Sequence, residues 1–456
     1  MRDNMSFFDC RWQSESIGHV SRKASMRTKG ILAPLSGLIL LFGCLFGPVT
    51  AGADAVTDWN LTAVNATLAS GIQFNRGLVV LAYVHAAIYD AVNSIDGRYT
   101  VFAAKPTMAK PDASEVAATA AAAYNVLKSV FPAQQASLDA AFAASLAAVP
   151  NGSAKSDGVA IGEEVARGIM ALRANDGLGA EIPYTFGKGP GVYQPTPPAN
   201  GLPILQDLAH LKPFTLLSPS QFRADGPPAL GSDRWARDYN EIKRMGAMNN
   251  SGRAPAQTQL ALMFTENSMT FFARIFRDFA QKQKLSLADD ARLFACLHVG
   301  MADALIAVFD SKYYYNAWRP ITAIQTGDTD GNPLTAADPS WAPAVNTPPH
   351  PEYPAAHGVA NGLVAETLRQ FFHTKKITIT FTSTVPNSGP PRVLTSTDQI
   401  EAQVIDARVY GGVHFRTSVE DAVKMGKQVG KWVALNYFRP VQADGQLVEN
   451  IRVDDE

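Results

Sequence analysis

The sequence predicts an all-α protein in which the helices pack into a bundle. Apolar residues recur at helical spacing over most of the chain, and 46% of its 456 residues are hydrophobic. Residues 113–148 are rich in alanine, the strongest helix former, so a helix is expected there. One short segment, KITITFTST at 376–384, is β-prone. A chain of this length can bury a core large enough to be stable without disulfides or metal sites. Strands are expected to be a minor component.

The N-terminal half contains three helical stretches followed by a long loop. Apolar spacing predicts a helix over 74–95 and another over 113–148, which is either continuous or broken near Pro132. A third helix is predicted over 156–174, where Asn, Asp and Gly then supply a stop. From 177 to 228 glycines and prolines recur among scattered aromatic residues. This texture is typical of an ordered loop or lid rather than of a linker.

The C-terminal half is predicted to be helical as well. Helices are expected over 232–246, 255–283, 286–318, 356–372, 397–410 and 417–438. The helix over 286–318 is expected to break at Pro320, because proline removes a backbone donor and clashes with the preceding turn. Lys312 and Arg319 are seven positions apart, which is two helical turns, so both are expected on one face of this helix.

Residues 26–53 are typical of a secretory signal peptide. They combine a basic start, an apolar stretch and small residues suited to signal peptidase. The alternative is an N-terminal membrane anchor, which the prolines and glycines in the stretch disfavour. Residues 1–25 fit no targeting class and are interpreted as an upstream extension before a start at Met26. The expected mature protein is exported to the periplasm or the medium, has no stable membrane anchor, and forms one catalytic domain, 54–456.

The charge balance and the cysteine content argue against certain binding partners and against thiol chemistry. Forty Lys and Arg against forty-one Asp and Glu give a net charge of -1, so nothing favours nucleic acid or an anionic membrane as a partner. Once 1–53 is removed, Cys296 is the remaining cysteine, and it lies in an apolar helical run. It is expected to be a buried core residue rather than a nucleophile. The composition is compatible with a homo-oligomer and does not decide the oligomeric state.

Rare polar residues between 305 and 440 are the candidates for chemistry. They are Lys312, Arg319, His357, Arg408 and His414. His357 begins a predicted helix after the proline-rich TPPHPEYPAAHG, where free backbone N–H groups and the positive end of the helix dipole favour an anion. Each residue alone is typical of a solvated surface or a hydrogen-bonded core position. Five of them together predict a cationic pocket for a tetrahedral oxyanion.

Three motifs resemble the vanadium-dependent haloperoxidase and type 2 phosphatidic acid phosphatase superfamily, whose pattern is K-x6-RP, PSGH and SR-x5-H. The corresponding segments are KYYYNAWRP (312–320), PAAH (354–357) and ARVYGGVH (407–414). The sequence departs from the pattern at Ala355 and Ala407, where the family has Ser, and at Ala356, where it has Gly. Ala355 removes one hydroxyl hydrogen bond to the anion. The resemblance covers the C-terminal third by motif and implies the helical-bundle fold of this superfamily.

The resemblance also implies a role for each residue of the pocket, with vanadate as the cofactor of a peroxidase. The oxyanion's oxygens are expected to bind Lys312, Arg319, the backbone N–H of Ala356, and Arg408. His414 would coordinate vanadium, or would attack phosphorus in a phosphatase. His357 would be the general acid or base, and Lys312 would also take part in catalysis.

The haloperoxidase branch is the better match. His350, seven residues before His357, stands where bromide-oxidising members carry a histidine, although an exposed loop histidine is the alternative reading. The phosphatase branch has an Asp four residues after its nucleophilic His. That position here is Ser418, although Asp421, one turn later, could reach back to His414.

The expected function is therefore that of a vanadate-dependent haloperoxidase. It would oxidise bromide or iodide with hydrogen peroxide to hypohalous acid, with a small organic acceptor as a further partner. An exported acid phosphatase that acts through phospho-His414 remains the alternative. A catalytically silent oxyanion-binding homologue stays open as well, because Ala355 and Ala356 replace the family's Ser and Gly.

Overall fold

The structure, a computed structural model, describes residues 54–107, 110–442 and 446–448. They belong to one unit of the chain, Thr50–Glu456. The predicted signal segment 26–53 and the upstream extension 1–25 lie outside the described residues.

The first part of the described chain is helical, as predicted. Its elements are α1 Ala55–Ala69, α2 Phe74–Asp96, α3 Glu115–Val130, the 3-10 turn η1 Pro132–Gln134, α4 Gln135–Ala147 and α5 Ser153–Arg173. The Ser114 hydroxyl accepts from the Ala117 N–H and starts α3, while Pro132 separates α3 from α4. The second of the two alternatives for the alanine-rich stretch, a helix broken near Pro132, is therefore confirmed.

The second part carries the remaining helices and one small sheet. The helical elements are η2 Gln206–Ala209, α6 Asp233–Met245, α7 Pro255–Met263, α8 Ser268–Gln283, α9 Leu287–Tyr315, α10 Pro320–Gln325, η3 Gly327–Thr329, α11 Ala356–Phe372, α12 Thr397–Tyr410 and α13 Arg416–Asn436. Strands β1 Ile379–Phe381 and β2 Arg392–Leu394 pair antiparallel, with Ile379 opposite Leu394. The predicted all-α class is confirmed.

Among the differences from the predicted helix boundaries, two change how the chain is divided into helices. The stretch 255–283 is two helices, because the side chain of Asn267 accepts from the Met269 and Thr270 N–H groups and starts α8 anew. Helix α9 ends at Tyr315, where Asn316 takes the left-handed conformation, and Pro320 is the first residue of α10. Lys312 and Arg319 therefore do not share one helix face.

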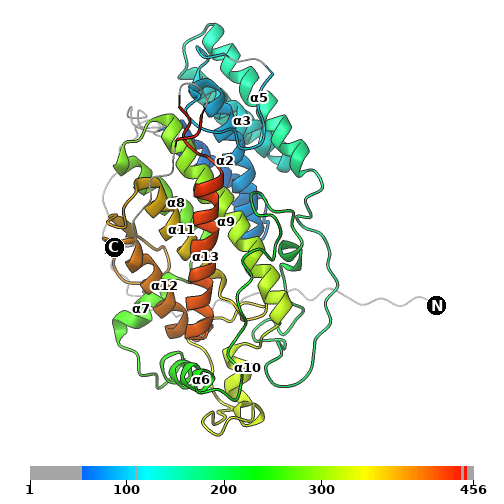
Figure 1. The fold of residues 1–456 in the computed structure, drawn as a ribbon, viewed down its shortest axis with the longest axis vertical. Helices are drawn as coiled ribbons and strands as arrows, with labels where there is room; N and C mark the ends of the chain where they lie inside the picture. The colour runs from blue at the N-terminus through cyan, green and yellow to red at the C-terminus, as the bar shows by residue number, and fades with distance from the viewer. Residues whose placement is uncertain (1–53, 108–109, 443–445, 449–456) are drawn as a thin grey trace, which may run out of the picture. The chain divides into compact units, whose positions relative to one another are not determined.

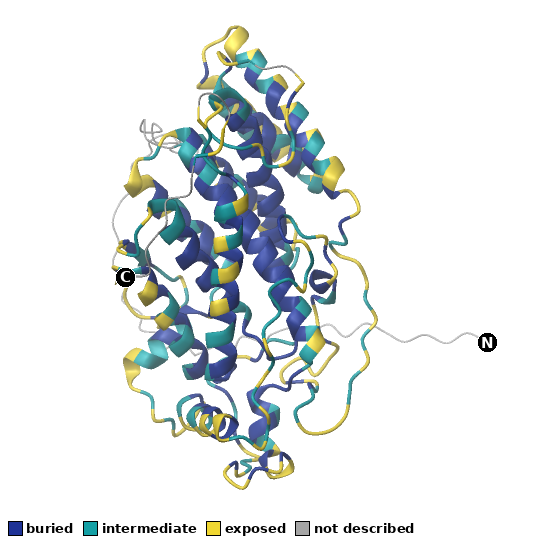
Figure 2. Ribbon diagram, viewed as in Figure 1, coloured by how far each residue is buried: buried dark blue, intermediate teal, exposed yellow. Residues whose placement is uncertain are grey.

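Helix α9 lies at the centre of the bundle, against α2, α11 and α13 (Figure 1). It is buried along nearly its whole length (Figure 2). Both α2 and α9 are long and apolar enough to cross a membrane, but 89% and 94% of their apolar windows are buried by other parts of the protein. Burial of this kind is typical of core helices.

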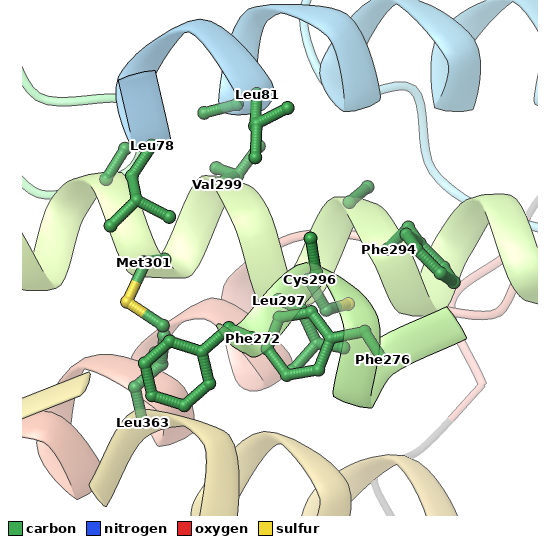
Figure 3. Packing of buried hydrophobic residues seen from close by; sticks show 14 of the residues in the cluster. Leu78, Leu81, Phe272, Phe276, Phe294, Cys296, Leu297, Val299, Met301 and Leu363 are labelled. Atoms are coloured by element: carbon green, nitrogen blue, oxygen red, sulfur yellow. The ribbon is translucent and has the colours of Figure 1, made fainter. Parts of the chain in front are cut away.

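Cys296 lies in this core, as predicted. Figure 3 shows it on α9 among Phe276, Leu297 and Val299. Burial raises the pKa of the Cys296 thiol to about 11, so the thiol stays protonated and unreactive at neutral pH.

Helices α11 and α13 approach each other through glycines, and this contact holds the start of α11 in place. A methyl group on Gly362 would lie 2.3 Å from the Val423 carbonyl oxygen, and one on Gly426 would lie 2.1 Å from the Val359 carbonyl oxygen. At the start of α11, the N–H of Ala355 donates to the Ser418 carbonyl at 3.2 Å. The close packing therefore fixes the first turn of α11 against the beginning of α13.

We expect Gly426→Ala to destabilise the protein by about 2 kcal/mol. The added methyl would strike a backbone carbonyl that cannot move without shifting α11, and such overpacking outweighs the roughly 1 kcal/mol gained in helix propensity. Gly430→Ala is the matched control, because its methyl would lie 3.1 Å from the Glu366 Cβ atom and 3.2 Å from the Leu363 carbonyl oxygen, whereas the methyl on Gly426 would lie 2.1 Å from a carbonyl oxygen. Denaturant unfolding should show a much smaller change for the control. Equal stability of the two variants would contradict the role assigned to Gly426.

Candidate active site

The predicted site residues come from separate segments that meet at the ends of α9, α11 and α12. Lys312 lies in the last turn of α9, Arg319 directly precedes α10, and Arg408 lies in the last turn of α12. His357 lies in the first turn of α11, and His414 lies between α12 and α13. A hydrogen bond between Arg319 and His414, and the electrostatic effects of the cations on one another and on His357, indicate that these side chains lie close together.

Arg319 is the centre of this group. Its Nη1 atom lies 3.2 Å from Nε2 of His414 and donates to the Val413 carbonyl at 3.0 Å. Its Nη2 atom lies 3.0 Å from Nδ1 of His350, and its Nε donates to the His350 carbonyl at 2.8 Å. A side chain that is fully buried is thus held by contacts on both sides of the pocket.

Lys312 is fixed by the proline-rich loop that precedes α11. Its Nζ atom donates to the carbonyls of Pro351 and Glu352, at 3.0 and 2.9 Å. An ammonium group has three donors, so one N–H remains for an anion. The side chain is fully buried, which makes a shared anion the natural partner for its charge.

A carboxylate that sequence reasoning missed positions His414. The Nδ1 atom of His414 lies 2.8 Å from Oε1 of Glu352, and the N–H of Phe415 donates to the same oxygen at 3.2 Å. The suggestion that Asp421 reaches back to His414 is wrong, because Asp421 accepts from the Tyr353 hydroxyl at 2.9 Å. Glu352 is the only acidic residue in TPPHPEYPAAHG, but no spacing rule connects it with His414.

This contact sets the protonation state of the His414 ring. Since a carboxylate accepts only, Nδ1 carries the proton, and Nε2 presents a lone pair. Burial lowers the pKa of His414 well below its usual value, and the nearby cations Arg319 and Lys312 lower it further. The Nε2 lone pair here accepts from the Arg319 guanidinium, and an unprotonated Nε2 of this kind can act as a ligand or as a nucleophile when Arg319 donates to a bound oxyanion instead.

Arg408 and His357 line an open cleft of about 800 Å³. Arg408 donates from Nη1 to the Phe264 carbonyl at 2.9 Å, while its buried Nε has no hydrogen-bond partner among the residues that the structure describes. The Nε2 atom of His357 lies 3.5 Å from the hydroxyl of Ser268, a second residue that sequence reasoning missed. His357 is partly exposed, so it can exchange protons with the cleft.

His350 is not an exposed loop residue. It is buried, it contacts Arg319, and its ring lies 5.3 Å from that of Phe309 in an edge-on arrangement. It also lines the cleft, so the alternative of an idle surface histidine is wrong. The long loop predicted over 177–228 contributes Pro198, Ile204 and Leu205 to the same cleft.

The electrostatics of the pocket favour an oxyanion. Burial lowers the pKa of Arg408 to about 9 and that of Arg319 to about 10, so these charges are poorly compensated. Burial, and after it the neighbouring Arg319, lowers the pKa of Lys312 well below its usual value, so an anion beside Lys312 would favour its charged form, whereas Glu352 is the acidic group that opposes Lys312 and Arg319. The first turn of α11 has no side-chain cap, because Ala355 carries no side-chain oxygen. These donors, the orphaned Arg408 Nε included, fit vanadate or phosphate.

The fold and this site define a class: a helical bundle in which buried cationic side chains surround a histidine that a carboxylate orients. Residues 292–443 match the family model of the VCPO second helical-bundle domain. Vanadium chloroperoxidase from Curvularia inaequalis is 29% identical over 185 residues, which are 33% of this chain and 30% of that protein. The match thus spans about a third of the relative's length.

Solved structures extend the similarity to most of the chain. The first bacterial vanadium-dependent iodoperoxidase has a TM-score of 0.70 and 24% identity, and the match covers 84% of this chain and 97% of that one. A holo-type bacterial vanadium-dependent chloroperoxidase has a TM-score of 0.61 and 19% identity, with 82% and 92% covered. The chain therefore has the fold of these vanadium haloperoxidases, and residues 292–443 are similar to the matched family model. The resemblance predicted from the three motifs is confirmed.

We expect Ala355→Ser to tighten phosphate binding about tenfold, because a hydroxyl at this helix start can donate to the anion while it accepts from the first turn. The same change should stabilise the protein by about 1 kcal/mol. Titration calorimetry with phosphate measures the affinity. Ala365→Ser is the control, since Ala365 is equally buried on α11 but lies far from its start. Unchanged affinity in Ala355→Ser would show that this position does not face the anion.

Proposed function

We propose that this protein is a vanadate-dependent haloperoxidase that oxidises bromide or iodide with hydrogen peroxide to hypohalous acid. The observation that carries the proposal is His414, whose Nδ1 is held by Glu352 and whose Nε2 faces a pocket of buried cations. The names of the similar proteins, a chloroperoxidase and an iodoperoxidase, support the same chemistry.

Each residue of the pocket then has a defined task. The oxyanion's oxygens would be bound by Lys312, Arg319, Arg408 and the backbone N–H of Ala356. His414 would hold vanadium through Nε2. Bound vanadate supplies the electrophilic activation of hydrogen peroxide without a change in its own oxidation state. His357, at the wall of the cleft, would take up and return the proton of the incoming peroxide.

His350 is the candidate for the halide site. It lines the cleft, and its Nδ1 lies against the Arg319 guanidinium, so a halide beside its ring would sense a positive potential. The apolar part of the cleft, which includes Phe74, Leu262 and Phe264, could receive a small organic acceptor.

One observation favours an acid phosphatase as the second candidate. A histidine nucleophile needs a carboxylate that orients its ring and stabilises the cation formed on phosphorylation, and Glu352 is placed to do this for His414. The same cations would bind a phosphate ester, because phosphate and vanadate share their geometry.

One preparation assayed in two ways separates these functions. A haloperoxidase should gain bromide or iodide oxidation when vanadate is added to the vanadate-free protein, and should lose it when phosphate competes. A phosphatase should hydrolyse a phosphomonoester and be inhibited by vanadate. Ester hydrolysis without halide oxidation would transfer the assignment to the phosphatase. Phosphate binding without either activity would favour a silent oxyanion-binding homologue.

We also propose that the protein is exported and that the catalytic domain begins near Asp54, after removal of residues 26–53. The basis is the sequence pattern of this segment. Mass spectrometry of material from outside the cytoplasm should show an N-terminus near Asp54. An intact N-terminal segment on cytosolic protein would contradict the proposal.

A further inference from the structure

A second cavity of about 340 Å³ lies beside the residues that hold His414. It shares no lining residue with the open cleft. Glu352 and Tyr353 line it on one side, and Phe415 and Ser418, which follow His414, line it on another. The cavity is therefore separate from the oxyanion cleft but adjacent to the carboxylate that orients His414.

The cavity has an exposed rim and a buried aromatic base. The rim is formed by Pro190, Pro227 and Ala229, which are exposed. At the base, the rings of Trp235 and Trp318 lie 5.9 Å apart and nearly parallel. The ring of Phe415, which is also buried, lies 4.8 Å from that of Trp235. Its volume lies at the lower end of the roughly 300–1,000 Å³ typical of small-molecule sites.

The lining offers hydrogen-bond acceptors on Asp238, Glu352 and Ser418. Asp238 and Glu352 are buried carboxyl residues. The buried Ser418 hydroxyl lies beside the Glu352 carboxylate, toward which it can donate, and its oxygen accepts no hydrogen bond from the described residues. A buried polar group of this kind costs stability unless something satisfies it. An occupant with an N–H or O–H donor would do so.

Charged side chains of both signs near the cavity limit the net charge that an occupant can carry. Lys312 and Arg319 act on Glu352 from the oxyanion pocket, which disfavours a cationic occupant at that end. The two carboxyl residues disfavour an anion. A neutral molecule is the best match to these opposing charges.

We propose that this cavity binds a small, neutral aromatic molecule that carries one N–H or O–H donor, of which indole and phenol are the simplest examples. The aromatic base supplies stacking surface, and the carboxyl residues and Ser418 supply the acceptors. The proposal shares Glu352 with the contact that orients His414, but it uses none of the residues that line the cleft.

Titration calorimetry of the full-length protein with indole and with 1-methylindole tests the proposal. Indole should bind, and 1-methylindole, which lacks the donor, should bind about tenfold more weakly, the loss expected for one hydrogen bond to a charged acceptor. Saturating phosphate should leave indole binding unchanged. Absence of indole binding, equal binding of both probes, or displacement of indole by phosphate would each overturn the proposal.

Variants locate the binding site. Ala229→Trp places a large side chain at the exposed rim and should weaken indole binding at least tenfold, whereas Leu217→Trp, at a position that is 81% exposed and lines neither cavity, should not. Ser418→Ala should weaken indole binding about three- to tenfold through loss of one polar contact. Thermal melting checks that each variant is folded. Wild-type affinity in both Ala229→Trp and Ser418→Ala would place indole elsewhere and refute the assignment.

Discussion

Replacing His414 by alanine should lower vanadate-dependent halide oxidation by roughly a thousandfold or more. The substitution removes the Nε2 lone pair that faces the pocket and leaves the three cations in place. Phosphate should therefore still bind, because the contacts proposed for it with Lys312, Arg319 and Arg408 do not involve the removed ring. Halide oxidation with added vanadate and calorimetry with phosphate give the two readouts.

His357→Ala is the matched comparison, since it removes the other predicted catalytic imidazole. It should reduce turnover about a hundredfold and change vanadate affinity much less, because an acid or base acts mainly on the reaction coordinate. If His414→Ala bound vanadate as tightly as the wild type, His414 would not be the ligand. If His357→Ala lost vanadate binding instead, the two roles would have to be exchanged.

The helices could be predicted wherever apolar spacing and a start signal agree. Helix α11 begins and ends at the predicted residues, because a proline-rich segment precedes its apolar run. Helix α1 was not predicted, since Thr57, Asn60 and Thr67 are buried and interrupt its apolar face. The end of α9 was predicted too late, because Asn316 adopts a left-handed conformation that no periodicity reveals.

The cations of the site could be predicted because Lys312, Arg319 and Arg408 are rare charges beside apolar helices. Their partners could not be predicted with the same rules. Glu352 reaches His414 from an irregular loop, and the path of that loop depends on the carbonyls that Lys312 and Arg319 bind. Asp421 has the helical spacing expected of an orienting residue, but it contacts Tyr353. Spacing identifies neighbours within a helix and not across loops.

Glu352→Ala should lower halide oxidation about ten- to a hundredfold, the usual cost of removing a group that orients a metal-binding histidine. The His414 Nδ1–H would lose its acceptor, and the ring would be free to turn its Nε2 away from the pocket. Glu352 is therefore a positioning residue. Phosphate affinity should be retained or increased, because the removed carboxylate opposes the cations that bind the anion.

Glu352→Gln separates orientation from charge, because the amide oxygen of glutamine can still accept from the His414 Nδ1–H. This variant should keep more activity than Glu352→Ala, and phosphate binding should again be at least as tight as in the wild type. A purely structural role would instead lower phosphate affinity, thermal stability and activity together in both variants. Phosphate affinity that falls in parallel with activity would therefore reject the orienting role of Glu352, whereas a fall in activity alone would support it.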